Sequence, residues 1–157
     1  MVILICGKIC CGKTTYARRL CRETGAALLS VDEIMLAIFG QHAGARHDEY
    51  AGHTRQYLLE KAAELERLGI GTVLDWGFWT KEGRREARAF FKSRGIPCAF
   101  HYLDIDDDTW HARLEKRNAA VQAGEAQDYF VDENLAAKFA ARCERPSPDE
   151  IDVWTQA

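Results

Sequence analysis

The chain has 157 residues, 47% of them hydrophobic and 29% charged, which suits one domain over residues 1–157 whose core needs no metal or disulfide. The net charge is −3 and the basic residues are spread along the chain, so no basic tract points to a nucleic-acid partner. No apolar run reaches the roughly 18 residues that span a bilayer, and Met1 leads directly into a strand-like run. We therefore expect a cytoplasmic protein without a membrane partner.

The six cysteines are scattered through apolar segments and include one vicinal pair, Cys10 and Cys11. This pattern favours reduced thiols over a disulfide framework. No C-x-x-C pair is present and no histidine stands at ligand spacing from a cysteine, so we do not expect structural zinc.

Apolar runs alternate with segments of helical periodicity along the whole chain. The runs predict strands at residues 2–6, 26–30, 71–75, 98–103 and 151–154. The periodic segments predict helices at residues 13–25, 32–40, 49–68 and 80–95, then from 106 and from 132 to before Pro146. Residues 41–49 are expected to form a loop. Alternating strands and helices predict an α/β fold of three layers, with a central parallel sheet of about five strands.

The segment Gly7-x-x-x-x-Gly12-Lys13-Thr14 matches the Walker A pattern of phosphate-binding loops. It follows a predicted buried strand and opens a predicted helix, which is the context that this motif requires. We expect a nucleoside triphosphate, ATP or GTP, with Lys13 at its β and γ phosphates and the Thr14 hydroxyl on Mg²⁺. The residues predicted to contact the nucleotide are Gly7, Ile9, Cys10, Cys11, Gly12, Lys13, Thr14 and Thr15.

Cys10 and Cys11 occupy variable positions of this loop. They are either small side chains that fit a tight turn, or thiols at a helix N-terminus whose oxidation or alkylation blocks nucleotide binding.

With these motifs, the chain resembles the small P-loop kinases grouped with zeta toxins, chloramphenicol phosphotransferase and the kinase domain of polynucleotide kinases. The matching segments are the phosphate loop with Thr14 and Thr15, and residues 30–32, 73–75, 110–117 and 139–150. The resemblance implies a fold like that of nucleoside-monophosphate kinases, with a small helical lid at about residues 111–131.

In such kinases an aspartate just past the second strand accepts the proton of the substrate hydroxyl, and the resemblance assigns this role to Asp32. If the second strand lies beside the first, Asp32 stands at the same sheet edge as the phosphate loop, where such sheets bind ligands. The alternative is that Asp32 only caps the following helix.

Arg113 and Arg117 are four residues apart and share one helical face. The resemblance implies that such lid arginines stabilise charge on the transferred phosphoryl group. With Glu115 and several aspartates nearby, they could instead be ordinary surface charges.

Three further groups are candidates for the acceptor or the metal. Asp75 ends an apolar strand, as a magnesium-binding acid does, and it is predicted to hold Mg²⁺, to bind substrate or to be a satisfied buried acid. The aromatic residues Trp76, Phe78 and Trp79 follow it at the mouth of the expected crevice and either wall an acceptor pocket or belong to the core. Arg46 and Tyr50, with His47 between them, complete the acceptor site by analogy alone.

The resemblance thus implies an ATP-dependent kinase that phosphorylates a hydroxyl of a small molecule such as a nucleoside, sugar, nucleotide-sugar or antibiotic. Its catalytic residues would be Lys13, Asp32, Arg113 and Arg117. The alternatives are a P-loop NTPase switch without an organic acceptor, a 5′-hydroxyl polynucleotide kinase, and a nucleotide-binding module without chemistry. The sequence leaves the acceptor and the oligomeric state open.

Overall fold

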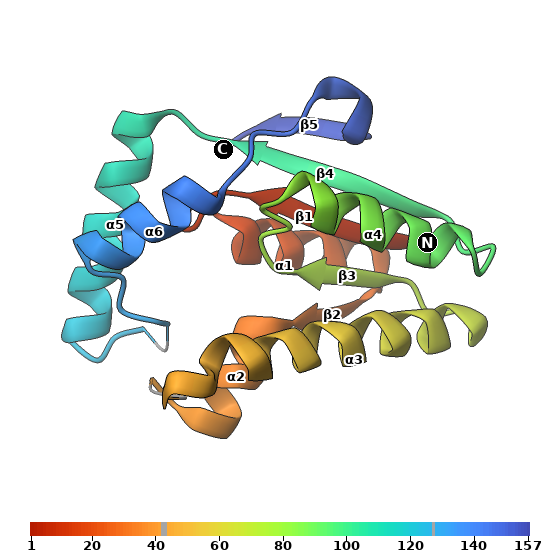
Figure 1. The fold of residues 1–157 in the computed structure, drawn as a ribbon, viewed down its shortest axis with the longest axis horizontal. Helices are drawn as coiled ribbons and strands as arrows, with labels where there is room; N and C mark the ends of the chain where they lie inside the picture. The colour runs from red at the N-terminus through yellow and green to blue at the C-terminus, as the bar shows by residue number, and fades with distance from the viewer. Residues whose placement is uncertain (42–43, 127) are drawn as a thin grey trace.

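The computed structural model describes residues 1–41, 44–126 and 128–157 (Figure 1). The strands are β1 (Val2–Gly7), β2 (Ala27–Ser30), β3 (Thr72–Asp75), β4 (Cys98–Asp104) and β5 (Val153–Gln156). The α-helices are α1 (Lys13–Thr24), α2 (Val31–Phe39), α3 (His47–Arg67), α4 (Lys81–Lys92), α5 (Asp107–Gln122) and α6 (Glu133–Arg142). Short 3₁₀ turns lie at Gly44–Arg46 and Pro148–Glu150. Each predicted strand and helix is present, with ends shifted by a few residues.

The five strands form one parallel sheet in the order β2-β3-β1-β4-β5. All six residues of β1 are buried, as its continuous apolar run predicts for a central strand. The expectation that the second strand lies beside the first is wrong, because β3 lies between them and pairs with both. β2 and β3 are both short apolar strands, and the hydrophobic pattern of their sequences does not indicate which of the two pairs with β1.

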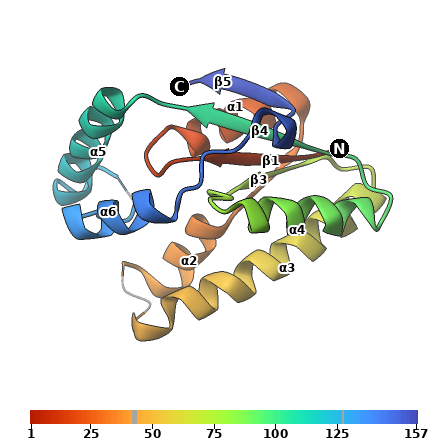
Figure 2. The same cartoon turned by 45° about the horizontal axis from the view of Figure 1, so that its top comes forward.

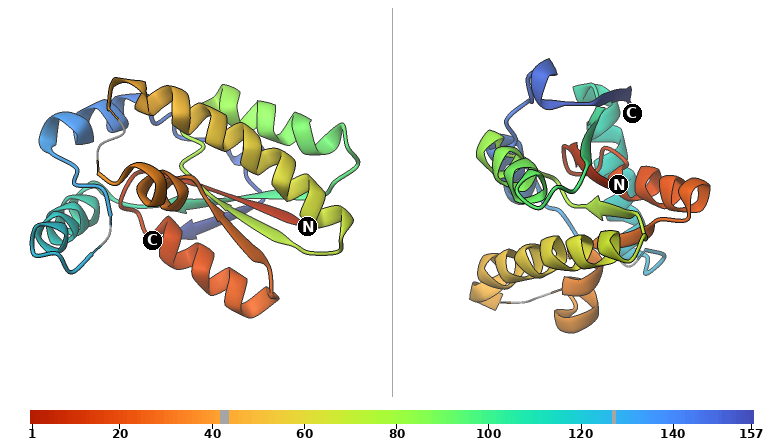
Figure 3. Two further views of the ribbon diagram at one scale, coloured as in Figure 1. Left: turned by 90° about the horizontal axis from the view of Figure 1, so that it is seen from below. Right: turned by 90° about the vertical axis from the view of Figure 1, so that its right-hand side faces the viewer.

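Alternate residues of β1 face two different helical layers. Val2, Leu4 and Cys6 belong to the core cluster with buried residues of α2, α3 and α4. Ile3 and Ile5 point to the other face and pack in the cluster that includes α1 and α5. Figure 3 shows α1 on the opposite side of the sheet from α3 and α4. The predicted three-layer α/β sandwich is confirmed.

The helix after β2 begins at Val31, one residue before its predicted start. The hydroxyl of Ser30 accepts a hydrogen bond from the Glu33 backbone N–H at 3.3 Å and caps the helix. Because Ser30 makes the cap, capping does not account for Asp32, which lies in the first turn of the helix.

Helices α5 and α6 lie together beyond the carboxyl ends of the strands, apart from the helices that cover the sheet (Figures 1 and 2). The predicted lid at 111–131 corresponds to most of α5 and to the segment that leads to α6. Its role as a lid stays a prediction. Within the described residues, no helix has the length and apolar character needed to cross a membrane.

Candidate nucleotide and acceptor site

The loop between β1 and α1 is tight at its two glycines, Gly7 and Gly12. A Cβ on Gly7 would lie 2.7 Å from the Cys11 sulfur and 2.9 Å from the Leu103 carbonyl oxygen. Gly12 has φ 97°, in the left-handed region that favours glycine, and directly precedes α1. The backbone therefore turns inward before the helix, which is the geometry of a phosphate cradle.

The Lys13 side chain folds over this loop. Its ammonium donates hydrogen bonds to the carbonyl oxygens of Lys8 at 2.6 Å and of Gly7 at 3.2 Å. Neutral carbonyls are weaker acceptors for an ammonium than phosphate oxygens are. The position of Lys13 thus suits a polyphosphate bound along residues 7–12. Thr14 and Thr15 follow in the first turn of α1, and both are exposed.

Asp75 is buried at the end of β3, next to the phosphate loop, and is 3% exposed. Burial raises the pKa of its carboxyl, while a hydrogen bond with the Thr14 side chain and the charge of Lys13 act in the opposite direction. A threonine hydroxyl beside a carboxylate is a donor set that fits Mg²⁺ bound mainly through phosphate and water. The described residues contain no cluster of three or more His, Cys, Asp and Glu side chains for a metal.

Asp32 is accessible to water, yet protein surrounds it on most sides. These surroundings raise the pKa of its carboxyl, and the charges of Lys13 and Arg117 act against the rise. Asp128 raises the pKa further and His47 lowers it. Side chains of α1, α3 and α5 and of the segment before α6 therefore act on the same carboxyl. Sequence analysis named Lys13 and Arg117 as catalytic residues together with Asp32, but it did not single out Asp128.

Three side chains on one face of α5 contact three successive residues of the phosphate loop, residues 9–11. The Trp110 indole N–H donates to the Ile9 carbonyl at 2.8 Å, and Arg113 Nη1 donates to the Cys11 carbonyl at 3.0 Å. One turn later, Arg117 Nη1 lies 3.2 Å from the Cys10 sulfur. The two arginines are thus bound to the loop, and the alternative that they are ordinary surface charges does not fit these contacts. Sequence analysis did not single out Trp110 for this role.

Arg117 also reaches toward the segment that precedes α6. Its Nη2 donates to the Tyr129 carbonyl at 3.1 Å, and the Asp128 carboxylate lies 3.9 Å away. The Arg117 Nε and the Tyr129 hydroxyl are buried without a hydrogen-bond partner among the described residues. Because buried donors are rarely left unsatisfied, these atoms mark a place where a ligand or water would complete the bonding.

Trp76 and Phe78 pack in the core. They are 8% and 7% exposed, their ring centroids are 4.6 Å apart, and Phe78 meets Phe100 edge to face at 5.3 Å. This packing favours the core interpretation over the pocket-wall interpretation, because little of either ring is left for a ligand to contact.

The same segment supports the phosphate loop through Trp79. Its indole N–H donates to the Gly7 carbonyl at 3.1 Å, and the Gly7 N–H donates to the Gly77 carbonyl at 3.3 Å. A Cβ on Gly77 would lie 1.9 Å from the indole nitrogen, so this residue must be glycine for the ring to reach the loop.

Arg84 fixes this turn, and sequence analysis missed it. Its side chain is 2% exposed, and Nη1 donates to the carbonyls of Phe78 at 3.0 Å and of Trp79 and Glu144 at 3.2 Å. Nε and Nη2 bind the Glu150 carboxylate at 3.2 Å. The available signal was an arginine on the apolar face of α4, aligned with Ala87 and Phe91.

Arg46, His47 and Tyr50 were proposed for the acceptor site by analogy. Of these three, only His47 is among the groups that shift the pKa of Asp32. Arg46 forms a two-pronged ion pair with Glu49 at 2.7 and 2.8 Å and lies over the Tyr50 ring. Tyr50 in turn stacks on Phe39. Arg46 and Tyr50 thus contact each other and their helix neighbours, and their acceptor role stays a prediction.

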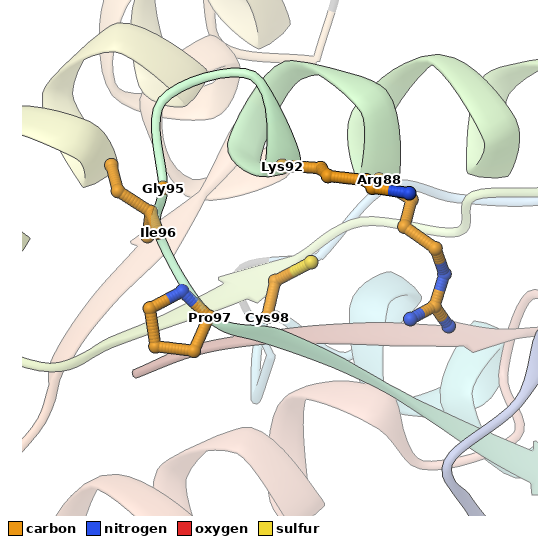
Figure 4. A pocket seen from close by; sticks show the side chains of 6 residues that line it. All are labelled: Arg88, Lys92, Gly95, Ile96, Pro97 and Cys98. Carbon is orange, nitrogen blue, oxygen red and sulfur yellow. The ribbon is translucent and has the colours of Figure 1, made fainter.

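Two surface hollows lie away from the phosphate loop. One, of about 390 Å³, is lined by Arg88, Lys92 and residues 95–98 where α4 leads into β4, at the amino end of the sheet (Figure 4). The other, of about 420 Å³, lies by the connection from α5, against Gln41, Val121 and Phe130. Neither contains a residue of the proposed site.

The parallel sheet, the glycine loop between β1 and α1, and the Thr14–Asp75 contact define a P-loop protein with a fold like that of nucleoside-monophosphate kinases. The family model AAA_33, described as an AAA domain, matches residues 2–146, and the chain belongs to this family.

Three known proteins are similar to this chain. A shikimate kinase of Xanthomonas axonopodis pv. citri is 33% identical over 81 residues, which are 46% of this chain and 45% of the relative. The structure of Chaetomium thermophilum Kti12 in complex with ADP-AlF3 has a TM-score of 0.74 at 16% identity and covers 100% of this chain and 88% of its own. The Mycobacterium tuberculosis APS kinase CysC, in complex with AMPPNP and APS, has a TM-score of 0.66 at 18% identity, with coverages of 99% and 87%. The match to the curated relative spans less than half of its length, and the structural likenesses confirm the fold.

Proposed function

We propose that the chain is an ATP-dependent phosphotransferase that moves the γ-phosphate to a hydroxyl of a small molecule. The observation that carries the proposal is a phosphate loop over which Lys13 folds and which Arg113 and Arg117 of α5 contact directly. The names of the similar proteins, shikimate kinase and APS kinase, support the same class of reaction. A nucleoside, sugar, nucleotide-sugar or antibiotic remains the proposed range of acceptors.

In this proposal the nucleotide phosphates bind the backbone N–H groups of residues 7–15 and the Lys13 ammonium. Thr14 and Asp75 would hold Mg²⁺, which when bound neutralises charge on the phosphates. Arg113 and Arg117, which already contact the loop, would stabilise the charge that develops on the transferred group.

Asp32 acts as the base. It takes the proton from the acceptor hydroxyl as the oxygen bonds to the γ-phosphorus, and the bond to the bridging oxygen breaks to release ADP. The raised pKa makes Asp32 a better proton acceptor than an ordinary surface aspartate. Phosphoryl transfer depends mostly on positioning and charge neutralisation, so no covalent intermediate with the protein is required.

The test is a panel of hydroxyl-bearing metabolites and antibiotics incubated with γ-labelled ATP, with GTP as competitor. We expect label in at least one organic product. The Asp32→Asn variant should bind ATP normally and lose turnover by about 10²-fold or more, the scale of general-base catalysis. Release of inorganic phosphate alone across the panel would favour the NTPase switch, and undiminished turnover by Asp32→Asn would remove the proposed base.

A further inference from the structure

Residues 128–131, which lie between α5 and α6, form a segment that we call the strap. The side-chain amide of Gln41, just past the end of α2, binds the strap backbone twice. Its Nε2 donates to the Asp128 carbonyl at 2.7 Å, and its Oε1 accepts a hydrogen bond from the Phe130 N–H at 3.4 Å. The strap is therefore anchored on one side to the carboxyl end of α2.

Helix α5 binds the strap from the other side. The Asn118 amide donates to the Val131 carbonyl at 2.6 Å and accepts from the Val131 N–H at 3.0 Å. The preceding residue, Arg117, donates from Nη2 to the Tyr129 carbonyl at 3.1 Å, while its Nη1 lies 3.2 Å from the Cys10 sulfur. One guanidinium thus joins Tyr129 to the phosphate loop, so this part of the strap lies beside the place proposed for the transferred phosphate.

The Tyr129 side chain is buried at its polar end. Its ring packs against the core cluster that includes Val31, the residue before Asp32, and it meets the His47 ring edge to face at 5.8 Å. The hydroxyl is shielded from solvent and has no hydrogen-bond partner within the described residues. A tyrosine hydroxyl can donate and accept, and leaving it unpaired in the interior costs free energy. The anchored strap therefore holds this hydroxyl in place for a partner that the described residues do not supply.

The charges around Tyr129 favour a neutral partner. Burial raises the pKa of its hydroxyl and the negative charge of Asp32 raises it further, so the phenol keeps its proton and an added anion would be repelled by Asp32. The nearby cations have other partners: Lys13 folds over the phosphate loop, and Arg117 contacts that loop and faces the Asp128 carboxylate at 3.9 Å. A sugar or polyol hydroxyl donates and accepts as the phenol does, and it adds no charge.

We infer that the Tyr129 hydroxyl binds a second hydroxyl of the acceptor, while the reacting hydroxyl faces Asp32. The acceptor is then a polyhydroxy compound, such as a sugar, a polyol or the ribose of a nucleoside, and a compound with a single hydroxyl is a poor substrate. The inference rests on the proposed function and narrows its acceptor. Gln41 and Asn118 act as positioning residues for Tyr129, because they bind the strap that carries it.

The first experiment removes only the phenol oxygen. Tyr129→Phe should raise the KM for the acceptor in the γ-labelled ATP assay by about tenfold, the loss of one hydrogen bond, with the KM for ATP within about twofold. The matched control is Tyr57→Phe, whose ring is 59% exposed on α3 and which should change neither constant. An unchanged acceptor KM in Tyr129→Phe would overturn the inference and leave the kinase proposal intact.

The second experiment removes the partner on the acceptor. Ribose is compared with 2-deoxyribose, and glucose and adenosine with their deoxy analogues. For the productive acceptor, one analogue should lose about tenfold in kcat/KM with the unchanged protein, and Tyr129→Phe should not distinguish this analogue from the parent compound. Independent losses from the substitution and from the missing hydroxyl would show that Tyr129 does not contact the acceptor.

The third experiment needs no turnover. Without ligand, Tyr129→Phe should unfold in urea at an equal or higher midpoint than the unchanged protein, because it removes an unpaired buried hydroxyl. A lower midpoint would show that the hydroxyl already has a partner, and would overturn the inference.

Calorimetry with a non-hydrolysable ATP analogue then measures the binding of ribose, glucose and adenosine. Binding that Tyr129→Phe weakens about tenfold, in a protein that phosphorylates none of them, would support the contact and refute the kinase proposal. If the unchanged protein binds and phosphorylates no polyhydroxy compound, the inference is overturned. Phosphorylation of an acceptor with a single hydroxyl alone would overturn it as well, while confirming the kinase.

Discussion

The Nη1 atom of Arg117, on α5, lies 3.2 Å from the sulfur of Cys10, so a thiol of the phosphate loop contacts this helix. Cys10 has φ 61°, a left-handed conformation that is uncommon for a residue other than glycine. The strained position of the loop residue and its contact with a proposed catalytic arginine make this thiol a sensitive point of the site.

We predict that alkylation of Cys10 lowers turnover and ATP affinity by more than about tenfold, because an added group displaces the Arg117 guanidinium and crowds the phosphate cradle. ATP should protect against the reaction. Cys11 has no exposed surface, and burial raises the pKa of Cys6 to about 12, so neither should compete for the reagent. Peptide mass spectrometry after iodoacetamide treatment, with turnover measured in parallel, checks this.

Cys10→Ser is the control for this modification. It should keep most of its activity and become resistant to iodoacetamide. If the variant is inactivated as fast as the unchanged protein, another cysteine is responsible and the importance of the Cys10–Arg117 contact is refuted.

The acid side of the pH profile should report Asp32. The protein around Asp32 raises its pKa and Lys13 and Arg117 lower it, so the base is active as a carboxylate only above a pKa that exceeds the ordinary aspartate value. The kcat/KM for the acceptor should therefore fall as the pH drops through this raised pKa. Profiles of kcat/KM report the free enzyme, which is the state described by the structure.

The Arg117→Gln variant independently tests the direction in which Arg117 shifts the pKa of Asp32. Removing a cation that lowers the Asp32 pKa should move the acid limb of the profile to higher pH, in addition to reducing turnover. Arg19→Gln, which lies on α1 away from Asp32, should leave the limb in place. An unchanged or downward-shifted limb in Arg117→Gln would mean that another group controls the profile.

Gly77→Ala should weaken ATP binding by about tenfold, equivalent to about 1.4 kcal/mol. The new methyl group would overlap the Trp79 indole, whose N–H holds the Gly7 carbonyl, so the ring must leave the loop. Equilibrium ATP binding measures the effect. Gly71→Ala is the control, since a Cβ there has its nearest contact at an ordinary 3.4 Å.

A double mutant distinguishes the Trp79 mechanism from a general loss of stability. If Gly77→Ala acts by displacing the indole, adding Trp79→Ala should cost little more, because the contact is already lost. Additive losses from the two substitutions would contradict the mechanism.

Much of the fold was predictable because its signals are local. The apolar runs, the helical spacing and Gly25 after α1 depend on neighbours within a few residues, and the strands and helices lie close to their predicted positions. The sheet order was not predictable in the same way. Whether β2 or β3 pairs with β1 depends on the packing of whole strand–helix units, which no window of sequence contains.

The residues of the candidate site also divide into those with a local sequence signal and those without one. Gly7, Gly12 and Lys13 were singled out because a single loop carries their chemistry, and in the structure both glycines lie in that tight loop with the Lys13 side chain folded over it. Trp79 and Arg84 were not recognised as supports of that loop, since their partners lie about 60 to 70 residues away. For Trp76 and Phe78 the sequence left a pocket wall and the core open, because it does not reveal which way a strand end turns, and both residues lie in the core.

Among the charged side chains that hold the turn beside the phosphate loop, Arg84 should contribute most to the free energy of unfolding. Arg84→Met leaves the Glu150 carboxylate and three backbone carbonyls without their donor, at about 3–5 kcal/mol of unfolding free energy for a broken buried pair. Urea unfolding measures this. The pKa of Glu150 is lowered despite its burial, because Arg84 and Ser147 bind its carboxylate, so this stability is lost as the pH falls through the lowered pKa.

Arg85→Met is the matched control, because Arg85 is the next residue of α4 and pairs with Glu82 at the surface. An exposed pair of this kind contributes about 0–1 kcal/mol, so the control should unfold almost as the unchanged protein does. The Arg84→Met variant should also lose the acid-dependent part of the stability that Glu150 contributes. Equal unfolding free energies for the two variants would mean that the bonds of Arg84 do not hold the turn that carries Trp79, and the support of the phosphate loop would have to come from elsewhere.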